Sequence, residues 1–314
     1  MKNLIFTFNV VSPVFLIIFL GLFLRKKKLI NDNFVIISSK IVFNVTVPSL
    51  VFIKLSSTNF GATFDLKQIV FVYTGVLVFF AISWIVSIFI SSDGKDRASF
   101  IQGSVRSNFA IVGFALISNT FGNHALSKAA ILLAFIMPLY NMLAVIALTV
   151  PVRKEKKLSY KKTILEIITN PLILATFIAV TFSYFNITLP QFLMKSINYL
   201  ATLTLPLALL GIGGSLNFES IKKDSKLAFL ATLFKIIIMP ASLTYVAFYL
   251  GYRGVELGVM FMLFATPTAI VSFIMAEAME CNSELAGNII VMTTLGSIVT
   301  ISLGIFLMKS VGLL

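Results

Sequence analysis

Long apolar runs alternate with short polar breaks along almost the whole chain. Each run has about 20 residues, the length at which a helix crosses the hydrocarbon core of a bilayer. Because backbone polar groups in lipid must be satisfied within their own segment, we expect each run to be a helix. The pattern predicts ten transmembrane helices, near residues 5–24, 33–53, 67–90, 98–118, 125–150, 163–186, 193–216, 226–250, 255–277 and 283–308.

The composition indicates a polytopic membrane protein. Of the 314 residues, 58% are hydrophobic and 12% are charged, whereas about a quarter of the residues of a soluble globular protein are charged. The ten runs leave only short loops and tails, so a soluble enzyme and a separate soluble domain are both excluded. The single cysteine, Cys281, cannot form an intramolecular disulfide, and the single histidine, His124, cannot build a multi-histidine metal site.

The net charge of +13 is explained by where the basic residues lie. The first run lacks a small-residue cleavage site and is followed by Arg25–Lys28, which is typical of a retained helix rather than a signal peptide. With the N-terminus outside, the cytoplasmic loops hold fifteen of the 25 Lys and Arg residues, against seven on the opposite side. This positive-inside bias predicts a cell-membrane protein with both termini outside and no nucleic-acid partner.

The longest cytoplasmic loop divides the ten helices into five and five. Because five is odd, a second five-helix unit enters the membrane from the opposite face, as in inverted-repeat transporters. The segment Val47-Pro48-Ser49-Leu50 is similar to Leu205-Pro206-Leu207-Ala208 in the second half of the chain. At the same separation along the chain, Asn108 of the first half corresponds to Thr266 of the second. We therefore predict an all-α membrane fold built as a 5+5 inverted repeat. Its parts are a first repeat over 1–150, a loop over 151–162 and a second repeat over 163–314.

Two of the predicted helices contain polar, helix-weakening segments. Helix 4 contains Gly103-Ser104-Val105-Arg106-Ser107-Asn108 and Gly113, and helix 9 contains Ala265-Thr266-Pro267-Thr268-Ala269. Unwound backbone is tolerated at membrane depth only where it is buried in protein or lines a cavity. If the two breaks cross, helix N-termini would face an anion and free carbonyls could hold a cation. The alternative is a pair of ordinary kinks packed by small residues.

Three basic residues fall within the predicted helices: Lys40, Arg106 and Lys235. The two lysines are near enough to helix ends to extend their ammonium groups to an interface. Arg106 lies deeper, where it costs about 2.5–3.5 kcal/mol and requires a partner such as a substrate carboxylate or helix-end carbonyls. All acidic residues fall in loops or at helix ends. This distribution disfavours a relay of buried acids and an intramembrane aspartyl protease, and it favours an anionic substrate.

The motifs, in their order and spacing, resemble the auxin efflux carrier family, which includes plant PIN-type exporters and bacterial malate or malonate permeases. The resemblance covers nearly the whole chain. It implies that helices 4 and 9 cross at the substrate site, that helices 1, 2, 6 and 7 form a scaffold, and that helices 3–5 and 8–10 form a mobile transport bundle. It also implies a homodimer formed through the scaffold. The matching segments are Val47–Phe52, Arg106–Asn108 with Gly113, Tyr140-Asn141, Asn170-Pro171, Leu205–Gly211, Pro240, Ala265–Thr268 and Glu284–Ala286.

The resemblance also implies site residues. Asn108 and the stretch around Thr266 and Pro267 would contact the substrate, with Asn44 and Pro48 on the facing scaffold. Ala115 stands where the family usually has proline, so the break of helix 4 would depend on Gly113. Asn44 and Asn141 could equally bond a neighbouring helix. The candidate substrate-binding residues are Arg106, Asn108, Gly113, Thr266, Pro267, Thr268, Asn44, Pro48 and Asn141.

These observations predict a secondary transporter of small organic anions, carboxylates such as malate, malonate or auxin-like acids, working by elevator-type alternating access. The alternative is a ligand-binding sensor or passive channel on the same fold. We expect no enzymatic activity, because no G-x-S-x-G motif is present and acids are missing at depth. No catalytic residue, cofactor or metal site is expected, and the coupling ion could be Na⁺ or H⁺. The expected partners are the anion, the bilayer and a second copy of the chain.

Overall fold

The computed structural model describes residues 2–56, 65–152, 169, 171–185, 187–216 and 225–314. Within these residues the chain is helical, with three short π-helical turns marked η. The helices, in chain order, are α1 (Lys2–Lys26), α2 (Asp32–Ile41), η1 (Val42–Thr46), α3 (Val47–Ser56), α5 (Leu66–Ile90), α6 (Gly94–Val105), η2 (Phe109–Gly113), α7 (Phe114–Thr149), α9 (Pro171–Tyr184), α10 (Gln191–Ser215), α11 (Ser225–Leu233), η4 (Phe234–Ile238), α12 (Met239–Tyr249), α13 (Gly254–Ala265), α14 (Val271–Ala278) and α15 (Ser283–Ser310).

Four helices begin at a side chain that accepts a hydrogen bond from the first turn. Asn31 caps α2 through the amide of Phe34 at 2.9 Å, and Asn282 caps α15 at 2.8 Å. Asp65 and Asp93 cap α5 and α6 in the same way, at 3.1 and 2.7 Å. Because the first amides of a helix have no partner within it, these caps fix where the helices start.

Seven of the described helices are long and apolar enough to cross a membrane: Ile5–Lys26, Asp32–Ser56, Leu66–Ile90, Ala125–Thr149, Gln191–Ser215, Lys226–Tyr249 and Ser283–Ser310. Each coincides with a predicted span. The predicted spans 98–118 and 255–277 are not continuous helices, and most of the 151–162 loop and the start of span 163–186 lie outside the described residues. The structure therefore has the helices of a multi-pass membrane protein, while the count of ten stays a prediction.

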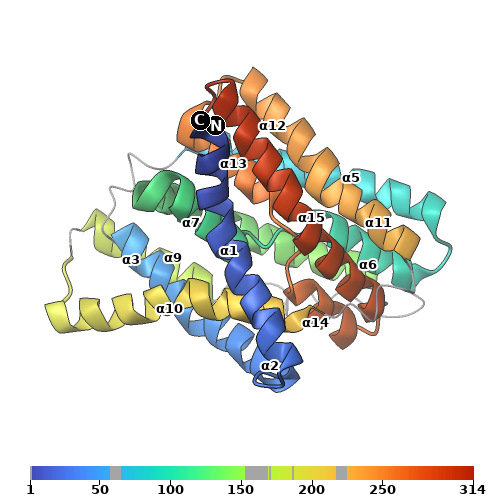
Figure 1. The fold of residues 1–314 in the computed structure, drawn as a ribbon, viewed down its shortest axis with the longest axis horizontal. Helices are drawn as coiled ribbons and strands as arrows, with labels where there is room; N and C mark the ends of the chain where they lie inside the picture. The colour runs from blue at the N-terminus through green and yellow to red at the C-terminus, as the bar shows by residue number, and fades with distance from the viewer. Residues whose placement is uncertain (1, 57–64, 153–168, 170, 186, 217–224) are drawn as a thin grey trace.

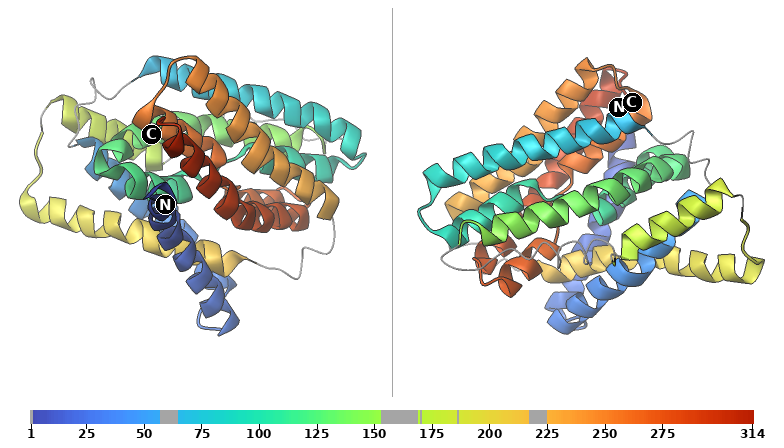
Figure 2. Two further views of the ribbon diagram at one scale, coloured as in Figure 1. Left: turned by 45° about the horizontal axis from the view of Figure 1, so that its top comes forward. Right: turned by 180° about the vertical axis from the view of Figure 1, so that it is seen from behind.

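The helices pack in two groups, visible in Figures 1 and 2. In one group α1 packs against α10, and α3 packs against both α9 and α10. In the other group α5 packs against α6, α11 against α15, and α12 against α13. Helix α7 contacts members of both groups, and α1 of the first group also packs against α15 of the second. The boundary between the groups is where the cavity described below is found.

Small residues allow α1 and α10 to approach closely. A Cβ atom added at Gly213 would collide with the carbonyl oxygen of Ile18, and one added at Gly21 would collide with that of Leu210. Backbone contact of this kind is typical of helix pairs in membranes, where close van der Waals packing drives association. The glycines of α10 therefore serve the packing of α1 against α10.

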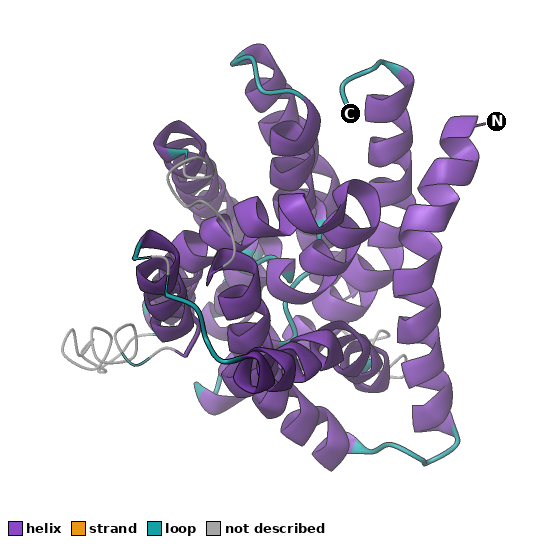
Figure 3. Cartoon of the chain, turned by 90° about the vertical axis from the view of Figure 1, so that its left-hand side faces the viewer, coloured by secondary structure: helices purple, strands orange, loops and turns teal. Residues whose placement is uncertain are grey.

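Helix α7 contains a sharp bend. Gly122 has φ 73° and ψ −167°, a backbone conformation that glycine adopts readily because it has no Cβ. The bend separates the short apolar helix that ends there from the long helix beginning at Ala125. The two chain termini lie at the same end of the molecule (Figures 1 and 3), and the Lys309 ammonium is 4.6 Å from the centre of the Phe6 ring.

Candidate functional site

Two interruptions between helices meet at the centre of the candidate site. The first lies between α6 and η2, and the second between α13 and α14. The Asn108 amide donates to the Pro267 carbonyl at 2.8 Å, and the Ala269 amide donates to the Arg106 carbonyl at 3.2 Å. The two segments thus form a short antiparallel bridge, although they are far apart in the sequence.

Threonine side chains hold this bridge in place. The Thr268 hydroxyl donates to the Gly103 carbonyl at 2.6 Å, and its amide donates to the Thr293 hydroxyl at 3.1 Å. The last carbonyls of α6 have no helical partner because the chain leaves the helix at Arg106. Thr268 therefore satisfies a buried carbonyl that the interruption leaves open.

A cavity of about 900 Å³ lies beside the bridge. Its volume falls within the range of small-molecule sites, about 300–1,000 Å³. Its wall comes from α2, η1, α3, α9 and α10 on one side and from residues between 106 and 111, α7 and α14 on the other. The polar or charged residues on the wall are Ser38, Ser39, Lys40, Asn44, Arg106, Ser107, Asn108, Asn141, Thr169 and Glu277.

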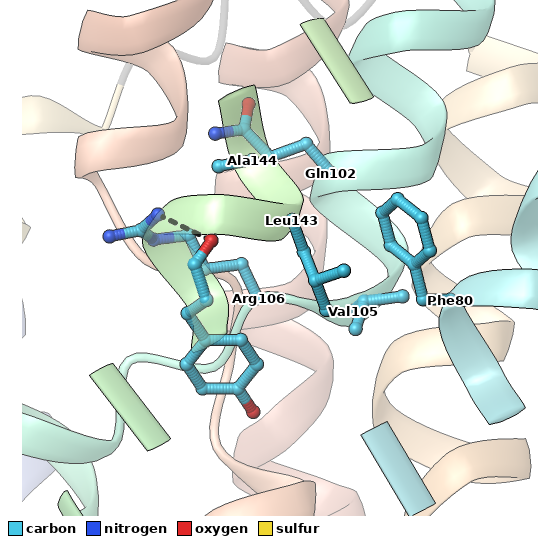
Figure 4. Close-up of a pocket in the computed structure, with 7 residues that line it drawn as sticks. Phe80, Gln102, Val105, Arg106, Leu143 and Ala144 are labelled. Atoms are coloured by element: carbon cyan, nitrogen blue, oxygen red, sulfur yellow. Dashed lines mark hydrogen bonds between the residues drawn. The ribbon is translucent and has the colours of Figure 1, made fainter. Parts of the chain in front are cut away.

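Arg106 brings an uncompensated positive charge to this wall. Its side chain is buried, with 4% of the residue exposed. Nη1 donates to the Tyr140 carbonyl at 3.3 Å (Figure 4), and Nη2 donates to Asn141 Oδ1 at 2.8 Å. A further contact reaches the Met275 sulfur at 3.7 Å. These acceptors are all neutral, and within the described residues Arg106 forms no ion pair.

Two helix beginnings face the same cavity. Ala110 and Ile111 of η2 line it, as do Ile270 and Val271 at the start of α14. The first amides of a helix lack helical acceptors, and its N-terminus carries partial positive charge. Asn108 also lines the cavity with 6% of its surface exposed, and its side chain forms no hydrogen bond with any described residue. The wall thus offers several donors to a ligand.

The structure brings four of the candidate residues together on the cavity wall and leaves five away from it. The four are Arg106, Asn108, Asn44 and Asn141, and the five are Gly113, Thr266, Pro267, Thr268 and Pro48. The Asn44 amide donates to the Lys40 carbonyl of its own helix at 2.8 Å. Thr266 is fully buried, and its hydroxyl donates to the Leu263 carbonyl at 3.4 Å.

The interruption after α6 lies upstream of Gly113. Gly113 has helical angles, φ −60° and ψ −49°, and helix runs through it and through Ala115. The backbone therefore does not break at Gly113 and instead leaves the helix at Arg106, which is extended at φ −73° and ψ 111°. Gly113 instead gives space to the ring of Phe109.

The two lysines within the predicted helices behave differently. Lys40 is exposed and lies on the cavity wall next to Ser38 and Ser39. This polar run within an apolar helix could have identified the three residues as part of the cavity wall from the sequence. Lys235 is fully buried, and its Nζ donates to the Phe264 carbonyl at 2.5 Å. The expectation that Lys235 extends to an interface is wrong, because the helix turns this side chain toward α13.

The comparisons with known proteins place the chain among membrane transporters. The family model described as "Membrane transport protein" matches residues 6–305. An uncharacterized transporter of Methanocaldococcus jannaschii is 24% identical over 308 residues, covering 94% of this chain and 96% of the relative. An uncharacterized transporter of Methanothermobacter thermautotrophicus is 21% identical over 299 residues, covering 93% and 95%. The chain belongs to the membrane transport protein family, that of the PIN-like auxin efflux carriers.

Proposed function

We propose that this protein is a secondary transporter of small organic anions, carboxylates such as malate, malonate or auxin-like acids, and that it works by elevator-type alternating access. Membership of the family supports transport in general. The observation that carries the substrate class is the buried guanidinium of Arg106, which faces the cavity with neutral acceptors only.

The charges on the cavity wall favour an anion. Burying an arginine at membrane depth costs about 2.5–3.5 kcal/mol, and a carboxylate within hydrogen-bond distance would compensate that charge. The helix beginnings at Phe109 and Val271 add positive potential, and the free Asn108 amide adds donors. Lys40 adds a second positive side chain, whereas Glu277 is the single acidic residue on the described wall. The balance is positive around Arg106.

The proposed architecture treats the interrupted pairs as two membrane helices that are broken midway. In this reading, α6 with η2 and α13 with α14 are the fourth helices of two inverted five-helix repeats. The antiparallel pairing of Asn108 with Pro267 supports this assignment, because Pro267 directly follows Thr266, the position to which the repeat offset relates Asn108. Carbonyl and amide groups freed by such breaks form the substrate and ion sites of inverted-repeat transporters.

The elevator mechanism is supported by the two packing groups. The group of α1, α2, α3, α9 and α10 corresponds to the proposed scaffold, and the remaining bundle corresponds to the moving part. The cavity lies on the boundary, with α2, η1 and α10 facing residues 106–111 and α14. A ligand held by Arg106 and the two helix beginnings would therefore travel with the moving bundle.

The position of the cavity supports an inward-facing state. Its wall includes most residues between Ile36 and Lys40 of α2 and between Val271 and Glu277 of α14, close to where α2 begins at Asp32 and α14 ends at Ala278. In the orientation predicted from the basic loops, these helix ends are cytoplasmic. The cavity would then receive its ligand from the cytoplasmic side.

Counterflow in proteoliposomes tests the proposed function. Liposomes loaded with an unlabelled dicarboxylate should accumulate the labelled acid. Arg106→Gln should abolish the accumulation, whereas Arg106→Lys should retain part of it. Arg253→Gln is the matched control, because Arg253 is exposed and bonds the Phe248 and Tyr252 carbonyls near its own position. Normal accumulation by Arg106→Gln would refute the site, and binding without accumulation would favour the sensor alternative.

A further inference from the structure

A lysine is fully buried in the middle of a membrane-length helix. Lys235 lies on η4 within the apolar stretch Lys226–Tyr249, with 0% of the residue exposed. Its Nζ donates to the Phe264 carbonyl near the end of α13, and among the described residues it forms no ion pair. A buried ammonium without a carboxylate is costly, so its surroundings must supply negative potential in another form.

The interruption after α13 supplies that potential. In a continuous helix the Phe264 carbonyl would accept from the amide of Thr268, but this amide donates to the Thr293 hydroxyl instead. The Leu263 carbonyl would accept from residue 267, which is a proline without an amide hydrogen, and it accepts from the Thr266 hydroxyl at 3.4 Å instead. The end of α13 therefore presents carbonyls that lack helical donors and carry the negative end of the helix dipole.

No acidic side chain on the described helices packed against Lys235 pairs with its ammonium group. The elements packed against η4 are α6, α11, α12, α13 and α15. Asp96, Glu256 and Glu284 each lie in the first turn of their helix, and none of the three forms an ion pair with Lys235. Glu256 is already paired with Lys128 at 2.6 Å.

Carbonyl ends of interrupted helices are the positions at which inverted-repeat transporters bind coupling cations. We propose that the Lys235 ammonium is the resident cation of this helix end. It takes the place in which a Na⁺ ion would otherwise bind to the α13 carbonyls, so transport by this protein requires no Na⁺. The consequence for transport rests on the proposed function, whereas the occupation of the helix end does not.

Thermal unfolding of the purified protein tests the occupation directly. The midpoint is measured in NaCl and in choline chloride at equal ionic strength for the wild type, Lys235→Ala and Lys226→Ala. Lys226 lies on the same apolar stretch but is exposed, so its variant is the matched control. Removing the Lys235 side chain opens the carbonyl end to a metal ion. Na⁺ should therefore raise the midpoint of Lys235→Ala in a saturable manner and leave the other two proteins unchanged.

Two results would overturn the proposal: stabilisation of the wild type by Na⁺, or no response of Lys235→Ala to Na⁺. Counterflow by the wild type gives a second measurement that does not depend on the folding of any variant. Replacing Na⁺ by choline should leave its rate unchanged, and a loss of about tenfold or more would contradict the proposal. If the wild type exchanges no carboxylate at all, the proposed function fails, while the unfolding measurement still decides the role of Lys235.

Discussion

Replacement of Thr268 by valine should weaken the bridge between the two interrupted helix pairs. Thr268 is 1% exposed, and its hydroxyl donates to the Gly103 carbonyl at 2.6 Å. Valine keeps the volume and the branched Cβ but removes the donor. Because the backbone amide of Thr268 still reaches the Thr293 hydroxyl, the variant loses one contact of the bridge rather than all of them.

The loss of stability in Thr268→Val is set by the Gly103 carbonyl, which the substitution leaves without a donor. The final helical bond of α6 in this region is donated by the Arg106 amide to the Gln102 carbonyl, so no helical amide replaces the lost hydroxyl at Gly103. A buried carbonyl left without a donor costs about 1–3 kcal/mol. We expect the free energy of unfolding to fall by this amount in Thr268→Val.

Thr294→Val is the matched control. Thr294 is equally buried at 1% exposure, but its hydroxyl donates to the Ile290 carbonyl of its own helix at 2.7 Å. That carbonyl lies within the regular hydrogen-bond ladder of α15, so the change should cost only about 0.5 kcal/mol. Equilibrium unfolding in mixed micelles compares the two variants under the same conditions. Equal stability of Thr268→Val and Thr294→Val would refute the claim that this hydroxyl holds the bridge.

Three further predictions concern one residue of the site, an ion pair away from it and the single cysteine. Asn141→Leu removes the acceptor that orients the Arg106 guanidinium, so the KM of counterflow should rise by about tenfold while the amount of folded protein is unchanged; an unchanged KM would contradict this role. The pair of Lys128 and Glu256 should show a coupling of about 0.5–1 kcal/mol in a double-mutant cycle of unfolding, and strict additivity of the two single variants would contradict it. Burial raises the pKa of the Cys281 thiol to about 11, so little thiolate is present at pH 8. Iodoacetamide should therefore label Cys281 only after denaturation, which mass spectrometry can check. Labelling of the native protein would contradict this prediction.

The hydropathy pattern predicted the membrane-length helices because length and apolarity are local properties of the chain. Seven predicted spans have such a helix, from Ile5–Lys26 to Ser283–Ser310. The polar composition around Arg106 also drew attention to the right region, since an arginine at depth demands partners. Its partners could not be predicted, because the Tyr140 carbonyl and the Asn141 side chain come from a separate part of the chain.

Lys235 shows the main limit of sequence reasoning for this protein. Its distance from the helix end permitted an extended side chain, but the direction in which it points depends on which face of the helix packs against α13. Asn44 lies on the cavity wall, as predicted for a site residue, but its side-chain amide donates to a carbonyl of its own helix. The sequence could not show which partner this amide has. Tertiary packing decides both outcomes.

Binding of an organic anion in the cavity beside Arg106 can be measured by substrate protection of a single cysteine. Ala110 lies on the cavity wall in the first turn of η2 and is partly exposed, so Ala110→Cys in a Cys281→Ser background places a reporter there. The rate at which a maleimide labels this cysteine is measured with and without a dicarboxylate. The acid should slow labelling in a saturable manner, and Arg106→Gln should abolish that protection. Labelling that the acid does not change, or protection that survives Arg106→Gln, would contradict binding of the anion beside Arg106.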